Sequence, residues 1–436
     1  MFDLIPPQLD PLHPKRHLTL LDTPFGERRV YDSLCFCNRC GSCQQACPTY
    51  WLTNEETFSP RGRNQLARLI SEKKLNVKNS RPLLERAVNS CLLCGRCTQA
   101  CAGKIPTAEH MLELRRTLQL NTLPKTLFTL LAWRTKHPHL FSRLVRLGAF
   151  LRACGLVFLA NKTGLARLCG FGWVNYASQI LPRRTPPLAK VLKQQGISTA
   201  PEKSTLIYLP SLEAEFCTPD LAATVLKTAN QKYRTAVWNN TPSGLFDYVY
   251  GDLRQSRRTV KRLLVRWETA GKLPLLTDSI DVYLFLSRAG QLFTAWPKWH
   301  KKAQEFAKNL KFVTDILPRH PAGAENFKNA PVRLDKGALF LREGKVFDKA
   351  QTTLKTLFKK NFVECLYKDA DSPAFGYSFV RFNCAPEIWL RAVQSTARTQ
   401  TGTVFTLSGL SALELNFYLK KFYPSAKADH FVRLNG

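Results

Sequence analysis

The chain has 436 residues, 44% of them hydrophobic, and a formal net charge of +32. The length is enough for two or three domains with a sizeable core. A charge of this size is typical of nucleic-acid binding, but the sequence carries no recognised nucleic-acid motif, so we do not expect nucleic acid as the partner. The charge instead fits an anionic membrane surface or an acidic partner subunit.

Residues 1–30 are rich in proline and predict an extended N-terminal arm. They show neither the apolar region nor the cleavage site of a secretory signal. No stretch of the chain approaches eighteen apolar residues without a charge, so we expect no transmembrane helix. The predicted location is the cytoplasm, either free or peripheral on the inner face of the cytoplasmic membrane.

Two cysteine runs with the spacing C-x2-C-x2-C-x3-C dominate residues 31–120. The first is Cys37, Cys40, Cys43 and Cys47, and the second is Cys91, Cys94, Cys97 and Cys101. This is the ligand run of bacterial ferredoxins, in which the fourth cysteine of each run reaches the other cluster. The sequence therefore predicts two [4Fe–4S] clusters, with Gly41 and Gly95 in the tight turns inside the runs.

The crossed pattern assigns each cluster three ligands from one run and the last ligand of the other. Cluster 1 takes Cys37, Cys40, Cys43 and Cys101, and cluster 2 takes Cys91, Cys94, Cys97 and Cys47. Two zinc sites are the alternative, although zinc usually takes separated CxxC pairs. Disulfides fit less well, because nothing indicates secretion. The other cysteines are predicted to be buried thiols, Cys35 beside a cluster: Cys35, Cys154, Cys169, Cys217, Cys365 and Cys384.

Helical signals lie between and beside the two runs. Ser59 is a natural N-cap and Pro60 a natural first residue of a helix, and a second helix is expected over residues 82–90. Because helices rather than a short hairpin separate the runs, we predict an α-helical ferredoxin domain at residues 31–120.

Residues 117–201 contain no Asp or Glu, and residues 121–202 are predicted to be a basic helical linker. The basic residues are Lys125, Arg134, Lys136, Arg143, Arg146, Arg152, Lys162, Arg167, Arg183, Arg184, Lys190 and Lys193. Interleaved apolar residues predict helices with one apolar and one basic face. Two interpretations stay open: a packed linker with a solvated basic face, or a segment that docks on a membrane or a partner.

From residue 203 strands and helices alternate, which predicts parallel sheets with crossover helices. Strands are expected at 204–210, 234–239, 281–287, 336–341, 362–367, 403–408 and 430–434. Helices are expected at 219–229, before 271, and at 297–309, 347–360, 386–397 and 410–421. The order recurs in two α/β repeats, residues 203–325 and 326–436, which indicates an internal duplication. The whole is an α+β multidomain chain.

No GxGxxG opens a helix after a strand and no P-loop is present, so the sequence shows no nucleotide or flavin fingerprint. No catalytic residue can be assigned from the order of the residues.

Residues 37–63 carry the most specific motif. After the first cysteine run come Cys-Pro-Thr-Tyr and then Ser-Pro-Arg-Gly-Arg, at 59–63. With the second run, this resembles the iron–sulfur subunits of glycolate oxidase (glycolate dehydrogenase), which are related to those of anaerobic glycerol-3-phosphate dehydrogenase and heterodisulfide reductase. Those relatives have two Cys-Cys-Gly repeats in the second half. This chain has Pro242 and Ser243 before Gly244, and no cysteine in 372–379.

The resemblance implies an electron-transfer subunit of a flavin-dependent 2-hydroxy-acid dehydrogenase complex of the glycolate or lactate type. A flavoprotein subunit would oxidise the substrate, and two [4Fe–4S] clusters would pass single electrons to a quinone or another acceptor. Arg61, Arg63 and Arg96 are candidates for tuning the clusters by placing positive charge nearby. The alternative for all three is an ordinary surface arginine, which is favoured for Arg96. The rival hypothesis is a docking or regulatory module that the clusters only stabilise.

Overall fold

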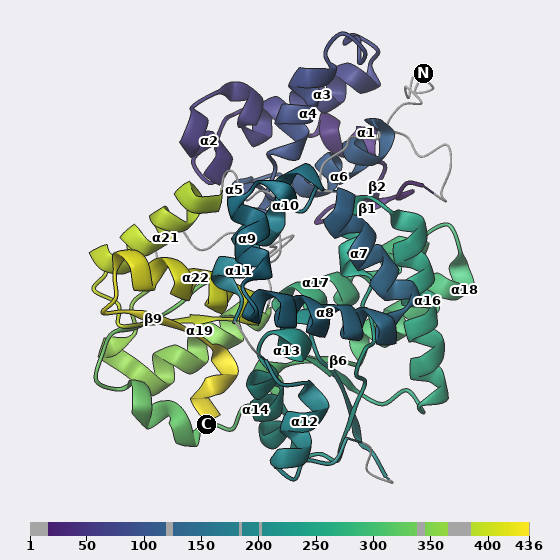
Figure 1. The fold of residues 1–436 in the computed structure, drawn as a ribbon. Coiled ribbons are helices and arrows are strands. Elements are labelled where there is room, and N and C mark those ends of the chain that lie inside the picture. The colour runs from purple at the N-terminus through teal and green to yellow at the C-terminus, as the bar shows by residue number, and fades with distance from the viewer. Residues whose placement is uncertain are drawn as a thin grey trace.

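The structure is a computed structural model that describes residues 16–118, 125–182, 185–199, 203–337, 345–364 and 385–435. Its N-terminal part, here the cluster domain, is helical after a short hairpin (Figure 1). The elements are β1 (Leu21–Thr23), β2 (Gly26–Arg28), α1 (Val30–Cys35), α2 (Pro48–Thr53), α3 (Pro60–Ser71), α4 (Arg81–Asn89), α5 (Arg96–Ala100) and α6 (Thr107–Leu118).

The local sequence explains these helices. The Ser59 side chain accepts a hydrogen bond from the Gly62 N–H and caps α3, whose first residue is Pro60, as predicted. In α4, Leu84, Ala87 and Val88 form the buried face. The cluster domain is thus ferredoxin-type and helical, in agreement with the sequence.

The prediction of an extended arm is wrong for the described part of residues 1–30. β1 and β2 pair antiparallel, with Leu21 opposite Arg28. Leu18 and Leu21 are fully buried. The Arg257 guanidinium donates a hydrogen bond to the carbonyl of His17 (2.9 Å). Polar residues alternate with apolar ones here, so the sequence alone does not indicate that the segment is buried. It packs against residues more than 200 positions away in the chain.

The described residues of the basic linker form six helices. They are α7 (Lys125–Lys136), α8 (Pro138–Ala153), α9 (Leu156–Lys162), α10 (Leu165–Leu168), α11 (Trp173–Ile180) and α12 (Leu188–Gln194). Arg134 is buried and pairs with Glu215 (3.2 Å), which holds α7 against the first α/β repeat. The predicted solvated basic face therefore does not include Arg134.

The first α/β repeat contains a four-stranded parallel sheet in the order β4-β3-β5-β6. Its strands are β3 (Leu206–Leu209), β4 (Thr235–Val237), β5 (Leu275–Thr277) and β6 (Leu310–Phe312). Its helices are α13 (Leu212–Phe216), α14 (Pro219–Asn230), α15 (Leu245–Tyr250), α16 (Leu253–Thr269), α17 (Ile280–Ser287) and α18 (Pro297–Lys308).

The second α/β repeat contains a parallel sheet in the order β7-β8-β9. Its elements are β7 (Val332–Leu334), α19 (Lys345–Phe358), α21 (Ala385–Arg398), β8 (Thr403–Thr406), α22 (Gly409–Phe422) and β9 (Lys427–His430). Phe362 forms a parallel bridge to Val332 on the free side of β7. With that bridge, the order of chain segments matches that of the first sheet.

Three predicted strands lie elsewhere. Residues 281–287 form helix α17, and the strand is β5 just before it. The strand expected at 336–341 is β7, a few residues earlier, and 338–341 lie outside the described residues. The strand expected at 430–434 is β9, and residues Phe431–Asn435 form a 3-10 turn. Of the strand expected at 362–367, only residues up to 364 are described.

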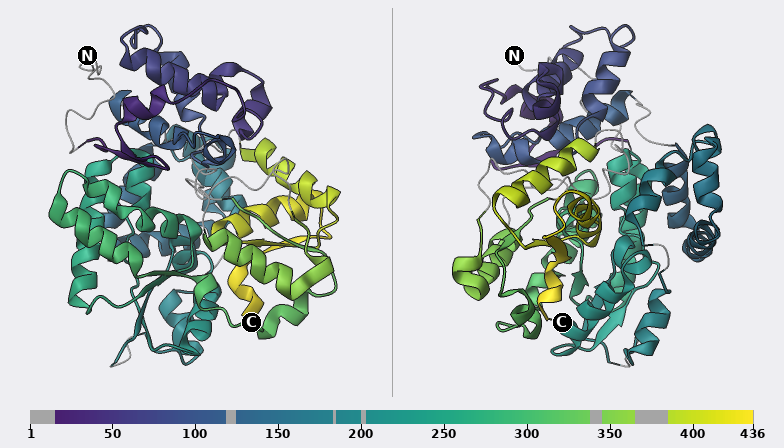
Figure 2. Two further views of the ribbon diagram at one scale, coloured as in Figure 1. Left: turned by 180° about the vertical axis from the view of Figure 1, so that it is seen from behind. Right: turned by 60° about the vertical axis from the view of Figure 1, so that its left-hand side comes forward.

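The parts share continuous cores. One hydrophobic cluster joins Leu112 and Leu114 of α6 to Ile207 and Trp267 of the first repeat. Another joins β3 with β7 and β8 of the second repeat. The cluster domain lies across one end of both repeats, whereas α8 and α9 stand out from the body (Figure 2). Each cysteine run is therefore anchored on a helical base that packs on the rest of the chain.

Candidate iron–sulfur centre

The first cysteine run is a loop between α1 and α2. Cys47 occupies the N-cap position of α2, directly before Pro48. Gly41 has φ +86°, and a Cβ there would lie 2.9 Å from Oε1 of Gln44, so the turn requires glycine. Cys37, Cys40 and Cys43 all lie on this loop.

The second run repeats this design. Cys91 and Cys94 lie in the loop after α4, Gly95 has φ +73° and caps α5, and Cys97 lies on α5 itself. Cys101 follows the last residue of α5. The short helix thus separates the third and fourth cysteines of the run.

The two runs face one another, and the thiol groups perturb each other across them. Burial raises the pKa of Cys43 to about 12, with further increases from the charges of Cys37 and Cys101. Burial also raises the pKa of Cys97 well above its usual value, with further increases from Cys94, Cys91 and then Cys47. Cys43 therefore has the last cysteine of the other run as a close electrostatic neighbour.

The second group shows the same crossing. Burial raises the pKa of Cys94 to about 11, and the charges of Cys47 and Cys91 add to it. A weaker influence of Cys43 on Cys97 shows that the two groups of thiols are also near each other. Thiols of both runs thus raise the pKa values of Cys43 and Cys97, and the crossed assignment of ligands stays a prediction.

The chemistry of these donors fits iron–sulfur clusters. Crowded, buried thiols resist losing their protons until a cation compensates the charge, and binding of a metal centre supplies that compensation. Among residues 16–118 and the other described ranges, no three metal-binding side chains converge on one point. A cubane does not need such convergence, because each of its four irons takes a separate thiolate.

Arg63 is the principal positive charge beside the second group of thiols. It is 2% exposed and donates hydrogen bonds to Sγ of Cys47 (3.6 Å) and to Oγ of Ser90 (2.7 Å). It also donates to Oγ1 of Thr49 (2.9 Å) and to the carbonyl of Ala87 (2.8 Å). Burial alone would lower its pKa, but the thiols of Cys91 and Cys47 outweigh it and raise the pKa. The sequence pointed to Arg63 but not to Thr49 or Ser90.

Arg61 lies on the other side of α3, toward the first run. It pairs with Glu56 (2.7 Å), is about one-third exposed, and donates a hydrogen bond to the carbonyl of Arg39 inside the cysteine loop (3.3 Å). Between the two arginines, Gly62 is required, because a Cβ there would lie 2.1 Å from the carbonyl oxygen of Glu56. The motif at 59–63 therefore places Arg61 beside the loop of the first run and Arg63 beside the second group of thiols.

Arg96 is not an ordinary surface arginine, which corrects the alternative considered for it. It is 8% exposed at the start of α5, and its charge lowers the pKa of the neighbouring Cys94, opposing the effect of burial. The sequence signal that was available is its position directly after the capping Gly95.

Three of the remaining cysteines differ from their prediction as buried thiols. Cys35, Cys154 and Cys169 are exposed. Cys217 is partly buried, and burial raises its pKa to about 12. Cys365 and Cys384 lie outside the described residues. Cys35 is the last residue of α1, whose buried positions are Val30, Ser33 and Leu34, so the end of this helix turns the thiol outward.

The loop that replaces the first Cys-Cys-Gly of the relatives is described. Pro242 and Ser243 precede Gly244, which has φ +88° and caps α15. The Ser256 hydroxyl donates a hydrogen bond to the carbonyl of Gly244 (2.9 Å). No cysteine lies in this loop, and the second predicted position, 372–379, lies outside the described residues.

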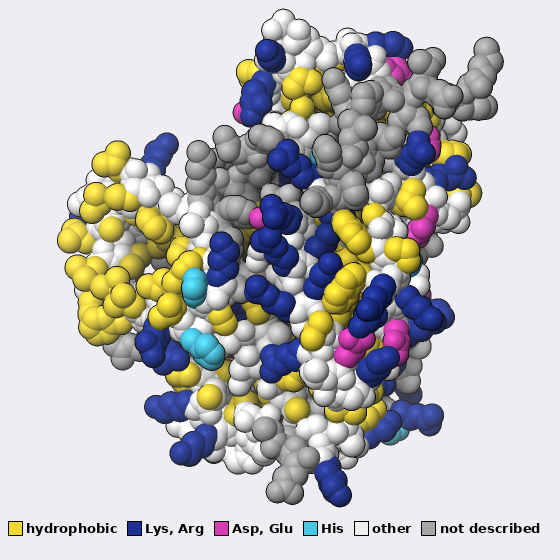
Figure 3. All heavy atoms as spheres, turned by 90° about the vertical axis from the view of Figure 1, so that its right-hand side faces the viewer, with side chains coloured by type: hydrophobic (Ala, Val, Ile, Leu, Met, Phe, Trp, Pro, Cys, Tyr) yellow, Lys and Arg dark blue, Asp and Glu magenta, His cyan; other side chains and the backbone are white. Residues whose placement is uncertain are grey.

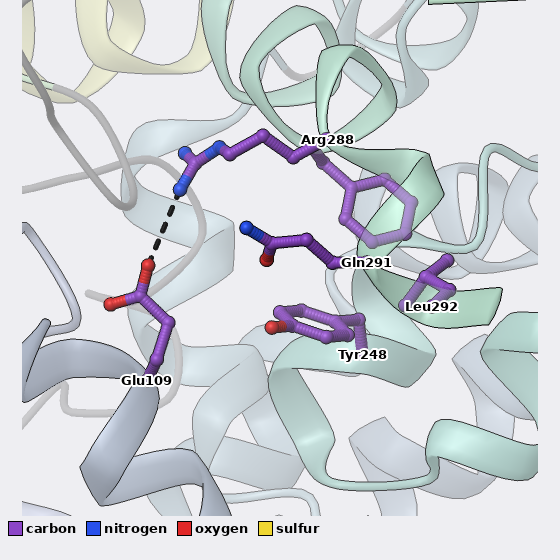
Figure 4. Close-up of a pocket in the computed structure, with 6 residues that line it drawn as sticks. Glu109, Tyr248, Arg288, Gln291 and Leu292 are labelled. Carbon is purple, nitrogen blue, oxygen red and sulfur yellow. Dashed lines mark hydrogen bonds and ion pairs between the residues drawn. The ribbon is translucent and has the colours of Figure 1, made fainter. Parts of the chain in front are cut away.

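A small cavity lies where the cluster domain meets the first repeat (Figure 4). Its volume is about 20 Å³, and Glu109, Tyr248, Arg288 and Gln291 line it with their polar groups. Arg288 bridges to Glu109 across the junction (3.3 Å). On the other side of the cluster domain, Arg391 of α21 donates to the carbonyl of Trp51 (3.3 Å). These polar contacts fix the cysteine runs relative to both repeats.

Comparisons with known proteins agree with this site. Residues 33–105 match the family model described as a 4Fe-4S dicluster domain. The chain is 22% identical over 323 residues to a probable glycolate oxidase iron-sulfur subunit of Bacillus subtilis (strain 168), covering 70% of this chain and 69% of that protein. No solved structure matches the chain. Over about two thirds of both chains, this protein is therefore similar to an iron–sulfur subunit, and it carries a 4Fe-4S dicluster domain at residues 33–105.

Proposed function

We propose that the chain is the electron-transfer subunit of a flavin-dependent 2-hydroxy-acid dehydrogenase complex and holds two [4Fe–4S] clusters. The observation that carries the proposal is the pair of C-x2-C-x2-C-x3-C runs on a helical base, within residues 33–105, which match a 4Fe-4S dicluster domain. A [4Fe–4S] cluster accepts and releases one electron at a time, so two of them suit a relay from a two-electron donor.

Different residues of the chain would have different roles in such a relay. Cys37, Cys40, Cys43 and Cys101 are the proposed ligands of cluster 1, and Cys91, Cys94, Cys97 and Cys47 those of cluster 2. Arg63 hydrogen-bonds to the thiol of Cys47 and keeps a positive charge in a buried site. Positive charge and hydrogen bonds at the ligand sulfurs favour the reduced state of a cluster.

The partner is a flavoprotein subunit that oxidises glycolate, lactate or a similar 2-hydroxy acid. Support comes from the relative, whose name describes it as a subunit of glycolate oxidase. The electrons would leave to a quinone or another acceptor, at a cytoplasmic site on or beside the inner face of the membrane.

The two α/β repeats are proposed to descend from a duplication, because both sheets are parallel and their segments follow the same order. The described loop at 242–244 has no thiol, so we assign no metal centre to it. The repeats would then serve as a scaffold that positions the cluster domain.

A redox titration of the anaerobic protein, with its clusters loaded, separates this function from its rival. The relay predicts clusters that take up one electron each and return reversibly to the oxidised state. Clusters that cannot be reduced without unfolding would support the docking or regulatory module instead. The isolated, flavin-free chain should not reduce a dye with glycolate or lactate, and such activity would refute a role limited to relay.

A further inference from the structure

The helices α8, α9 and α10 expose large hydrophobic side chains, which we call the apolar lobe. Leu168, Phe158 and Phe150 are 85%, 72% and 63% exposed. The full set is Leu140, Leu144, Leu147, Phe150, Leu156, Phe158, Leu159, Leu165 and Leu168. Figure 3 shows hydrophobic side chains gathered on the projecting part at its left edge. Contiguous exposed apolar surface of this kind marks an interaction site rather than ordinary protein surface.

The charge of the lobe has one sign. Arg143, Arg146, Lys162 and Arg167 are exposed among the apolar residues. Residues 117–201 contain no Asp or Glu, so no carboxylate of this segment neutralises them. Arg183 and Arg184 lie outside the described residues and are not used here. A mixture of apolar side chains and unopposed basic ones is complementary to anionic lipid.

The shape of the lobe also fits a bilayer surface. Among the described residues, no single helix is long and apolar enough to cross a membrane. The pair α8 and α9 passes that test by length and composition, but the two helices meet at 75°. Gly155, with φ +78° and no atom within 4 Å of a Cβ placed on it, makes the bend. A bent, projecting apolar surface can enter the boundary between head groups and acyl chains without crossing the membrane.

We propose that the apolar lobe binds the surface of an anionic lipid bilayer and thereby attaches the whole chain to it. The lobe projects from the body and is spread over α8, α9 and α10, which a fluid lipid interface accommodates without a shaped partner. This inference does not depend on the electron-transfer function, because the lobe contains none of the cluster ligands.

The lobe is joined to the body through the Ser142 hydroxyl of α8, which donates a hydrogen bond to Oδ1 of Asn240 in the first repeat (2.8 Å). Within the linker, a second contact holds α8 against the segment around α11. The Arg152 guanidinium donates to the carbonyl of Pro182 (3.0 Å) and to that of Ser178. Arg152 is therefore a structural residue, whereas Arg143 and Arg146 are exposed on α8. A test by charge reversal must leave Arg152 unchanged.

The apolar contribution is tested with the double substitution Phe158→Glu and Leu168→Glu in the full chain with its clusters loaded. Co-sedimentation is measured with vesicles of phosphatidylcholine containing phosphatidylglycerol, and with vesicles of phosphatidylcholine alone. We expect the parent to bind the anionic vesicles and the variant to bind them at least about tenfold more weakly. The control is Val265→Glu with Phe422→Glu, which changes two apolar residues outside the lobe that are 46% and 49% exposed, and it should bind like the parent.

The basic contribution is tested with Arg143→Glu and Arg146→Glu. Each basic residue near an anionic surface contributes about fivefold in affinity, so reversing the pair should weaken binding by roughly 25-fold or more. Raising the salt concentration should weaken the parent as well, because exposed charges are screened over about 8 Å at physiological ionic strength. Lys301→Glu with Lys308→Glu makes the same change of charge on α18 and should have a much smaller effect.

Two results would overturn the proposal. One is a parent protein that fails to bind anionic vesicles at low salt while its cluster spectrum is intact. The other is a lobe variant that binds vesicles like the parent but no longer co-purifies with the flavoprotein subunit, which would make the lobe a protein interface. In both cases the redox titration of the clusters still tests the electron-transfer function separately.

Discussion

Replacing Arg63 with glutamine should lower the reduction potential of cluster 2. The arginine is buried, and its guanidinium donates to Sγ of Cys47 (3.6 Å), so the substitution removes a cation and a charge-assisted hydrogen bond from one ligand. A hydrogen bond to a charged group contributes about 1.5–3 kcal/mol. For a one-electron couple this energy corresponds to roughly 65–130 mV. Since the reduced cluster carries the extra negative charge, the potential should fall by that amount.

The assay is a potentiometric titration followed by electron paramagnetic resonance, on parent and variants. Arg61→Gln is the matched control, because Arg61 is partly exposed and paired with Glu56, and it should shift either potential by no more than about 20 mV. Arg63→Lys keeps the cation without the planar fork and should lie between the parent and Arg63→Gln. A potential of cluster 2 that Arg63→Gln leaves within about 20 mV of the parent would refute this reasoning.

Three further predictions concern ligation, backbone packing and pH. Cys43→Ser and Cys101→Ser should damage the same cluster, as seen in the resonance spectrum; if Cys101→Ser spoils the other cluster instead, the crossed ligation is wrong. Gly62→Ala should lower the free energy of unfolding by at least about 1–3 kcal/mol, because the new Cβ would lie 2.1 Å from a carbonyl oxygen. A lower midpoint of thermal unfolding would report this loss. Gly148→Ala, where the helix leaves open space, should raise stability by about 0.5–1 kcal/mol, and equal effects of the two would contradict the packing argument. Burial, and then the charge of a neighbouring carboxylate, raises the pKa of Glu213 from 4.5 to about 8, so the folded protein keeps a proton that the unfolded chain releases. Stability from this group should therefore fall as the pH rises from about 4.5 to about 8, and a stability–pH curve that Glu213→Gln does not flatten would count against it.

The cluster domain could be predicted in detail because its signals are local. The spacing of the cysteines, the cap at Ser59 and the proline after it are all carried by residues that are close together in the sequence. Parallel sheets could be predicted for the second half because strands and helices alternate. The positions of several strands could not. Residues 281–287 are an apolar run that suits a buried strand or a buried helix equally, and only the adjacent β5 decides for the helix.

What the sequence could not predict depends on contacts between distant residues. The burial of Arg96 and the contact of His17 with Arg257 need the folded domains in place. The sequence of the acid-free linker shows interleaved apolar and basic residues, but the pattern does not tell which of them face outward. Arg134 pairs with Glu215 and Arg152 donates to the carbonyl of Pro182. Phe158 and Leu168 are exposed instead.

The central claim is that electrons from a 2-hydroxy acid pass through this chain. The most direct measurement uses the complex isolated through a tag on this chain, kept anaerobic and followed by electron paramagnetic resonance as glycolate or lactate is added. The account predicts that two one-electron cluster signals per chain appear with substrate and disappear when an acceptor is supplied. A complex that transfers electrons from substrate to acceptor while both clusters stay oxidised throughout, and are never reduced by the flavin, would contradict it.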